Sequence, residues 1–259
     1  MNHPRYSYPP GRFVRAAWDL LLARRRDLQR DAKACIERMS AELKVLGAEN
    51  IPKRGSCVLT INHFHRPGLG AQWIALAVTA LVPLPMRWAV TGELMCEGKW
   101  YRSLGSVASI IFLKRLAHIY GLITMPPMPP RLKDVEARAA SVRAILEYVK
   151  HTNDPVIGIS PEGYNPPSGV LTRPASGFGR FALLLSKAGM RFIPVGGYEA
   201  DGIFHIHFGK EYELRAQSNT CTCVQCRCLS ADEKDKQAMQ IVMQNIACCL
   251  PRHLQGEFA

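Results

Sequence analysis

Ser56-Cys57-Val58-Leu59-Thr60-Ile61 runs directly into Asn62-His63-Phe64-His65-Arg66-Pro67-Gly68, and this stretch decides the fold prediction. The short apolar run at 56–61 is typical of a buried strand. His63 follows at the point where that strand would end. In open α/β sheets, ligands bind at the carboxyl ends of the strands. An imidazole titrates near neutrality and can take a proton from a hydroxyl group. The stretch therefore predicts a core strand that carries His63 to a catalytic or binding edge.

Outward from this strand, short apolar runs alternate with longer helical stretches. This alternation favours a mainly parallel sheet flanked by helices, in a single α/β domain that spans residues 51–259. Further strands are expected at 86–90, 121–124, 155–159, 191–195 and 203–208. Helices are expected at 69–80, 104–120, 178–188 and 232–250, with another that begins at an Asp134 cap and runs through Val149.

Residues 1–50 are predicted to form an N-terminal amphipathic helical segment, with one helix over residues 13–46. Its first part places Phe13, Trp18 and several leucines beside six arginines between residues 12 and 30. This composition suits the headgroup region of an anionic bilayer. The alternative is a helix that packs on the domain and leaves its arginines in water.

The net charge of +12 over 259 residues indicates an anionic partner. Nucleic acid is not favoured, because no zinc-finger, recognition-helix or RNA-binding signature is present and the arginines gather beside apolar residues. No secretory signal is visible, and Pro83, Pro85 and Arg87 interrupt the longest apolar stretch, 71–90. We therefore expect a cytoplasmic protein that is peripheral on a membrane. The sequence does not indicate its oligomeric state.

Nine cysteines, an odd number, argue against a disulfide framework. Four of them lie in one short segment: Cys221, Cys223, Cys226 and Cys228. Four thiolates could bind zinc or a cuprous ion, but this spacing is cramped for one tetrahedral ion. A reduced surface loop is the alternative, and no metal site is predicted.

A second motif, Ile159-Ser160-Pro161-Glu162-Gly163, also follows a predicted strand. Pro161 fixes a turn, Glu162 is carried to the strand end, and Gly163 lets a ligand approach the backbone. By itself this motif is weakly specific, because the same residues serve in a simple strand-to-helix connector. A single histidine such as His63 is equally weak evidence, since it can have a purely structural role.

In chain order with Ile193-Pro194-Val195, the two motifs resemble the 1-acylglycerol-3-phosphate acyltransferase family of glycerolipid acyltransferases. That family has an Asn-His at a strand end with an Asp five residues past the His, then Pro-Glu-Gly, then an apolar-Pro-apolar strand. The resemblance covers roughly residues 51–198 and includes Gly92-Glu93-Leu94 and Gly105 between the motifs.

The resemblance implies transfer of a fatty acyl group from acyl-CoA or acyl carrier protein to a lysophospholipid or related lipid hydroxyl. His63 would be the catalytic base, and Asn62, Pro161, Glu162 and Gly163 would bind the substrate. The thioester is a co-substrate, and no metal or organic cofactor is implied. The expected partners are a membrane surface, the lipid substrate and, for some donors, acyl carrier protein.

The sequence departs from the family pattern at three positions. Gly68 stands where the Asp partner of the histidine is expected, and His65, Glu93 or Glu162 could replace that carboxylate. The two arginines expected to grip a phosphate are also absent, with Asn165 and the Pro126-Pro127 pair in their places. Arg131, Arg173 or Arg180 could substitute, and Arg173 is included in the predicted substrate site. A second hypothesis follows: a lipid-binding protein on this scaffold that has lost catalysis.

Overall fold

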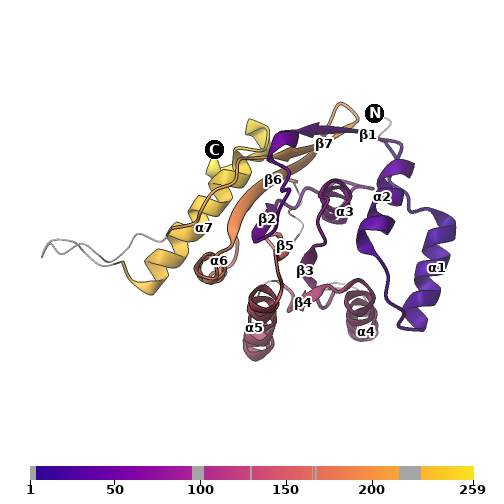
Figure 1. Cartoon of the computed structure of the whole chain (residues 1–259), viewed down its shortest axis with the longest axis horizontal. Coiled ribbons are helices and arrows are strands. Elements are labelled where there is room, and N and C mark those ends of the chain that lie inside the picture. Colours follow the sequence, from indigo (N-terminus) through magenta and orange to yellow (C-terminus); the bar gives the residue numbers. More distant parts are fainter. Residues whose placement is uncertain (1–3, 95–101, 129, 165, 167, 216–228) are drawn as a thin grey trace, which may run out of the picture.

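The structure is a computed structural model that describes residues 4–94, 102–128, 130–164, 166, 168–215 and 229–259. In these ranges seven strands form one sheet in the order β1-β7-β6-β2-β5-β3-β4 (Figure 1). All neighbouring strands are parallel except the β6–β7 pair, which is antiparallel. The predicted α/β fold with a mainly parallel sheet is confirmed. The strands are β1 (Glu42–Leu46), β2 (Cys57–Ile61), β3 (Arg87–Thr91), β4 (Ile123–Met125), β5 (Val156–Ile159), β6 (Arg191–Ala200) and β7 (Ile203–Phe208).

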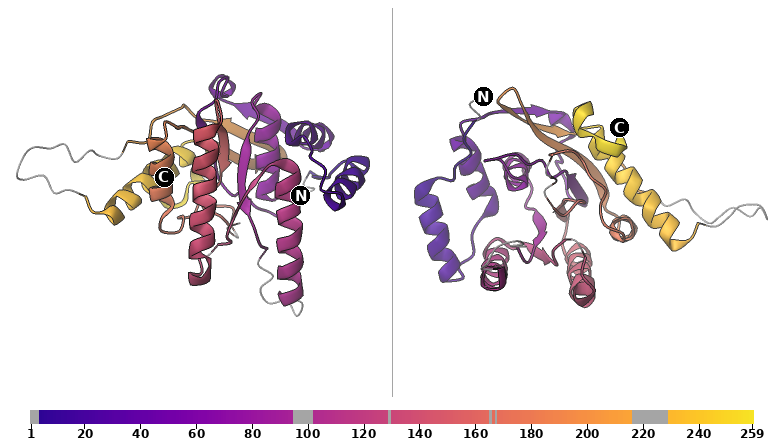
Figure 2. Two further views of the ribbon diagram at one scale, coloured as in Figure 1. Left: turned by 60° about the horizontal axis from the view of Figure 1, so that its bottom comes forward. Right: turned by 180° about the vertical axis from the view of Figure 1, so that it is seen from behind.

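Helices cover both faces of the sheet, as the views from front and back show (Figures 1 and 2). Two adjacent glycines of β6 mark how closely they pack. A Cβ on Gly196 would lie 2.3 Å from the carbonyl oxygen of Cys249, and one on Gly197 would lie 2.6 Å from Ile74. The helices are α1 (Pro10–Leu21), α2 (Leu28–Arg38), α3 (Ala71–Leu81), α4 (Arg102–Tyr120), α5 (Val135–His151), α6 (Phe178–Lys187) and α7 (Ala231–Ala247), with short 3-10 turns at Ala48–Asn50, Leu132–Asp134, Arg252–Leu254 and Gly256–Phe258.

The central strands are buried on both faces. Every residue of β2 and of β5 is buried, and the neighbouring residues Phe192 and Ile193 of β6 are at most 1% exposed. A parallel strand covered by helices on both sides has no solvent face and therefore carries a continuous apolar run. This is why the run at 56–61 identified the centre of the sheet.

The prediction of one helix over residues 13–46 is wrong. The segment forms α1, then α2, then strand β1, which pairs in parallel with β7. The Asp27 side chain caps α2 by accepting a hydrogen bond from the backbone N–H of Arg30 at 3.0 Å. Leu43 and Leu46 continue the helical spacing of α2 but lie in β1, so the sheet includes residues that precede position 51.

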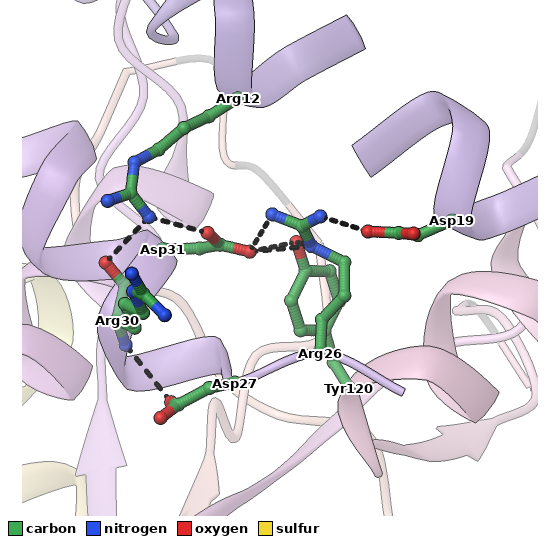
Figure 3. A network of polar contacts seen from close by, with 7 residues as sticks. All are labelled: Arg12, Asp19, Arg26, Asp27, Arg30, Asp31 and Tyr120. Carbon is green, nitrogen blue, oxygen red and sulfur yellow. Dashed lines mark hydrogen bonds and ion pairs between the residues drawn. The ribbon is translucent and has the colours of Figure 1, made fainter. Parts of the chain in front are cut away.

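A network of ion pairs ties α1 and α2 to the end of α4 (Figure 3). Arg26, in the loop between α1 and α2, pairs with Asp19 of α1 and, at 2.6 Å, with Asp31 of α2. The Tyr120 hydroxyl at the end of α4 donates to Asp31 at 2.8 Å, and Arg12 of α1 reaches the same carboxylate at 3.0 Å. The side chains of Arg26 and Asp31 are 9% and 14% exposed, so water screens the network only partly.

None of the helices in the described ranges is long and apolar enough to cross a membrane. The four clustered cysteines between residues 221 and 228 lie outside the described residues, so the structure does not test what they bind.

Candidate active site

The two sequence motifs meet at one edge of the sheet. β2 pairs in parallel with β5, with Thr60 opposite Ile159, so both strands end at the same edge. Asn62 and His63 leave β2 there, and the 160–163 turn leaves β5 beside them. Strand β6, which carries the predicted Ile193-Pro194-Val195, flanks β2 on its other side.

Asn62 is almost fully buried, at 1% exposure. Its Oδ1 accepts from the backbone N–H of Gly197 at 2.7 Å, and its Nδ2 donates to the Gly197 carbonyl at 3.0 Å. These two hydrogen bonds fasten the chain after β2 to β6 and so fix the direction in which His63 leaves the sheet. The prediction that Asn62 binds substrate stays a prediction.

Glu162 is completely buried, and its carboxylate is held by backbone and hydroxyl donors. Oε2 accepts from the backbone N–H of His63 at 2.6 Å, and Oε1 accepts from the N–H and the hydroxyl of Thr172 at 2.8 and 3.0 Å. Burial raises the pKa of Glu162 to about 7, although these hydrogen bonds favour the charged form. Glu162 therefore joins the loop after β2 to the loop around Thr172.

The His63 imidazole lies between this carboxylate and a hydroxyl group. Its Nδ1 is 2.5 Å from Ser160 Oγ and 4.0 Å from Glu162 Oε2. Burial lowers the pKa of His63 to about 4, so the ring is neutral at neutral pH. A neutral imidazole in this position can accept a proton. Of the predicted replacements for the missing aspartate, Glu162 lies beside the ring, whereas Glu93 is ion-paired with Arg131.

The turn after His63 explains why glycine stands at position 68. Arg66 and Leu69 exchange two backbone hydrogen bonds of 2.9 Å around Pro67 and Gly68. Gly68 has φ +84°, the conformation that a Pro-Gly type II turn requires at its second central residue. An aspartate there would be strained, so this turn and the family's Asp at this position are poorly compatible.

Two neighbouring segments close over the motifs. Gly163 has φ +71°, and a Cβ on it would lie 2.6 Å from Met128 Cγ, so the Met128 side chain rests on the turn. A Cβ on Gly169 would lie 3.2 Å from the Phe64 ring. Pro161, in the same turn, is buried. The site thus combines a few polar groups with apolar walls. In the described parts of the chain, no cluster of His, Cys, Asp or Glu could hold a metal ion.

The arginines predicted to grip a phosphate are all engaged by carboxylates. Arg138, which sequence reasoning missed, lies beside Met128 instead: its guanidinium donates to the Pro127 carbonyl at 3.1 Å and contacts Met128 Sδ at 3.7 Å. Within the described residues it has no carboxylate partner. Asp134 stands at the N-cap of α5, as predicted, but its side chain pairs with Arg131 and makes no capping hydrogen bond. The ion pairs are Arg131 with Glu93 and Asp134, Arg173 with Glu257, and Arg180 with Asp232.

Two comparisons with known proteins bear on the family and the fold. The family model described as Acyltransferase matches residues 42–197, which is more than half of the chain. The fold is similar to the crystal structure of the 1-acyl-sn-glycerophosphate (LPA) acyltransferase PlsC from Thermotoga maritima, with a TM-score of 0.51 and 14% sequence identity over 90% of this chain and 80% of that one. No curated protein matches the chain. The family match confirms the resemblance predicted from the ordered motifs: the chain belongs to the acyltransferase family.

Proposed function

We propose that the protein transfers a fatty acyl group from a thioester, acyl-CoA or acyl carrier protein, to the hydroxyl of a lysophospholipid or related lipid. The observation that carries the proposal is the neutral His63 imidazole, held at the carboxyl edge of the sheet by a hydroxyl at 2.5 Å and next to the buried Glu162. A ring with only apolar or cationic neighbours would instead support the lipid-binding alternative.

In the proposed reaction, His63 accepts the proton of the acceptor hydroxyl as its oxygen attacks the thioester carbonyl carbon. The new C–O bond forms and the C–S bond breaks. The thiolate leaves and recovers the proton from the imidazolium, so His63 returns to its neutral form. Glu162 holds the His63 backbone in place through the 2.6 Å hydrogen bond, and its charge lies 4.0 Å from Nδ1 when it is ionised.

A membrane surface is the proposed location of this reaction. No residue of α1 is buried, and Phe13, Val14, Trp18 and Leu21 are each at least 60% exposed. α1 lies at the margin of the molecule, outside α2 (Figure 1). This exposure does not support the alternative in which α1 packs its apolar face on the domain. An amphipathic helix with an outward apolar face and neighbouring arginines suits an anionic bilayer.

α4 extends this apolar surface. Its residues Val107, Ile111 and Phe112 are 58%, 55% and 47% exposed. Arg115 of α4 donates to the carbonyls of Leu20 and Leu21 at the end of α1, at 3.2 and 2.9 Å. Together with the Arg26–Asp31 network of Figure 3, this contact fixes α1 relative to α4. We call the exposed apolar residues of α1 and α4 the apolar platform.

Arg138 is proposed to meet an anionic group of the acceptor. It lies beside Met128, which in turn covers Gly163, so its charge is next to the motif turn. A guanidinium without a carboxylate partner can offer its donors to a phosphate. Arg173 is proposed only as a peripheral contact, since its guanidinium already binds Glu257 at 2.6 Å.

The test is thiol release by the purified protein from acyl-CoA, and separately from acylated carrier protein, against a panel of acceptors. The panel includes an anionic lysophosphatidate, a zwitterionic lysophosphatidylcholine and a neutral monoacylglycerol. The proposal predicts multiple turnovers that depend on acceptor, with preference for the anionic headgroup. Binding to lipid vesicles without turnover on any donor and acceptor would favour the lipid-binding protein.

A further inference from the structure

We propose that Ser160 is the residue that fixes the tautomer of His63, in the place of the carboxylate that Gly68 replaces. The consequence for rate rests on the proposed function, but the hydrogen-bond arrangement itself does not. Ser160 acts on the reaction through His63, so we call it a positioning residue.

The assignment follows from counting protons. Ser160 Oγ lies 2.9 Å from the Ile61 carbonyl oxygen and 2.5 Å from His63 Nδ1. A carbonyl oxygen can only accept, and a hydroxyl has a single proton to donate. With that proton on the bond to Ile61, Ser160 Oγ must accept from His63, so Nδ1 carries the ring proton. Nε2 is then unprotonated, which leaves its lone pair for the acceptor hydroxyl.

The parallel sheet places the serine for this role. Thr60 of β2 is opposite Ile159 of β5 in a parallel pair. The next residue after Ile159 is Ser160, and it therefore lies beside Ile61 and Asn62, which come next after Thr60. A short side chain at this position can reach the Ile61 carbonyl and the His63 ring together. The partner of the histidine therefore comes from the neighbouring strand, while an aspartate in the Pro67-Gly68 turn would be strained at the φ of +84° that Gly68 adopts.

A hydroxyl partner differs from a carboxylate because it carries no charge. It selects the tautomer but stabilises the imidazolium only weakly, which agrees with the pKa of His63 lowered by burial to about 4. Glu162, whose Oε2 lies 4.0 Å from Nδ1, places a negative charge beside the ring when it is ionised. Tautomer control and charge stabilisation are therefore divided between two neighbouring residues of one turn.

Ser160 could instead be a nucleophile that forms an acyl ester. The geometry argues against this role. Its proton is directed to the Ile61 carbonyl, and an Nδ1 that carries a proton cannot act as the base for Ser160. An acyl group found on Ser160 would overturn the positioning role.

The experiment uses Ser160→Ala, Ser160→Thr and a matched control, Ser186→Ala. Ser186 is also half-buried and also donates to a backbone carbonyl, that of Leu214 at 2.5 Å, but it makes no hydrogen bond to a histidine in the described parts of the chain. The first readout is the 15N spectrum of histidine-labelled protein at neutral pH, with His63 assigned by its loss in His63→Ala. We expect the proton on Nδ1 in the wild type, Ser160→Thr and Ser186→Ala, and a shift of the proton toward Nε2 in Ser160→Ala.

The second readout is turnover. Ser160→Ala should lower kcat roughly 10- to 100-fold with little change in KM, because only part of the ring population keeps the reactive tautomer; a fully wrong tautomer costs about four orders of magnitude in a serine protease. Ser160→Thr should restore most of the rate. The tautomer shift without turnover in any protein would uphold the role of Ser160 and sink the proposed function. The same tautomer in Ser160→Ala as in the wild type, or a trapped acyl-Ser160 by mass spectrometry, would overturn the inference.

Discussion

The sheet edge around His63 and the apolar platform on α1 and α4 both depart from the usual arrangement of polar groups outside and apolar groups inside. The sheet edge withdraws polar groups from water, and the platform exposes apolar groups to it. At the sheet edge, the Glu162 carboxyl group is fully buried and the His63 imidazole is 17% exposed, and backbone or hydroxyl partners meet both carboxylate oxygens and His63 Nδ1. On the platform, Phe13 and Trp18 are exposed to solvent, whereas the side chains of the nearby Arg26–Asp31 ion pair are largely buried. Buried ionisable groups and contiguous exposed apolar groups are both uncommon without a functional reason.

The comparison indicates that separate parts of the chain serve the proposed reaction and the proposed binding to a membrane. The polar groups of the site are fixed by contacts among β2, β5, β6 and the loop at Thr172. The platform is fixed by α1, α2 and α4. A change in one region should therefore leave the function of the other intact, and each prediction below tests that separation.

Among the variants that keep His63, the largest effect is expected from Glu162→Gln. Three donors point at the carboxylate: the backbone N–H of His63, the backbone N–H of Thr172 and the Thr172 hydroxyl. In the variant, the NH2 group of the amide must face either the His63 donor or the Thr172 donors, so that two donors oppose each other. We expect kcat to fall about 100-fold and the free energy of unfolding to fall by about 3 kcal/mol. Turnover assays and urea unfolding measure these losses.

The matched control for that change is Glu211→Gln, an exposed carboxylate paired with Arg191. It should change both quantities little, since exposed ion pairs contribute about 0–1 kcal/mol. Vesicle binding should be unchanged in both variants. Equal losses in the two proteins would contradict the special role of the buried carboxyl group.

Replacing both Phe13 and Trp18 by serine should have the opposite result: vesicle binding should weaken and turnover should be kept. Each aromatic side chain buried in a bilayer interface contributes about 1.5 kcal/mol, so the loss of both should weaken binding to anionic vesicles about 100-fold. Turnover on a short-chain, water-soluble acceptor should stay at the wild-type rate. Leu184→Ser, at an exposed apolar position on α6, is the control. Wild-type vesicle binding by the double variant would show that the platform is not the membrane-binding surface.

A smaller effect is predicted for the pH dependence of stability. The pKa of His63 is lowered from 6.5 to about 4, so its contribution to stability rises with pH between those values. The pKa of Glu162 is raised from 4.5 to about 7, so in that range the folded protein keeps a proton that the unfolded chain has lost, and stability falls as pH rises. The two contributions oppose each other in the wild type.

His63→Ala should expose the contribution of Glu162 alone. The free energy of unfolding of this variant should therefore fall by about 3 kcal/mol as the pH rises from 4.5 to 7. Glu162→Gln should show the reverse slope between pH 4 and 6.5. Urea unfolding at a series of pH values measures both curves. Curves parallel to that of the wild type would show that burial does not shift these two groups.

The smallest effect is expected from Tyr120→Phe, which removes from the network of Figure 3 the hydrogen bond donated to Asp31 and the one accepted from Arg26. The remaining ion pairs of Asp31 with Arg26 and Arg12 should hold α1 and α2 in place. We expect a loss of about 1 kcal/mol in the free energy of unfolding and unchanged turnover. A loss of vesicle binding would mean that this hydroxyl, rather than the ion pairs, orients the platform.

Much of the fold follows from the sequence because the sheet is buried on both faces. The prediction for residues 203–208 matches β7, and the run at 56–61 contains β2. The N-terminal segment failed for a physical reason. Residues 42–46 are only partly buried at the edge of the sheet, so their apolar residues continued the helical spacing of α2 instead of marking a strand.

The candidate site was predictable as a set of motifs but not as a set of contacts. Family resemblance identified His63 and Glu162, and their proximity follows from parallel pairing of β2 and β5. The role of Ser160 depends on which side chain reaches Nδ1, and that of Arg138 depends on how the 125–130 connector returns to α5. Neither contact can be predicted from the spacing of residues in the sequence, because both form only when the chain folds.

The most direct test of the central claim is the ratio of kcat between the wild type and His63→Ala on one donor and acceptor, with product identified by mass spectrometry. His151→Ala, at an exposed histidine of α5, is the control. Our account predicts acylated product from the wild type and the control. In His63→Ala the rate should fall by a factor of about 1,000 or more, as expected for loss of a general base. Product formation by His63→Ala within a few-fold of the wild-type rate would contradict it.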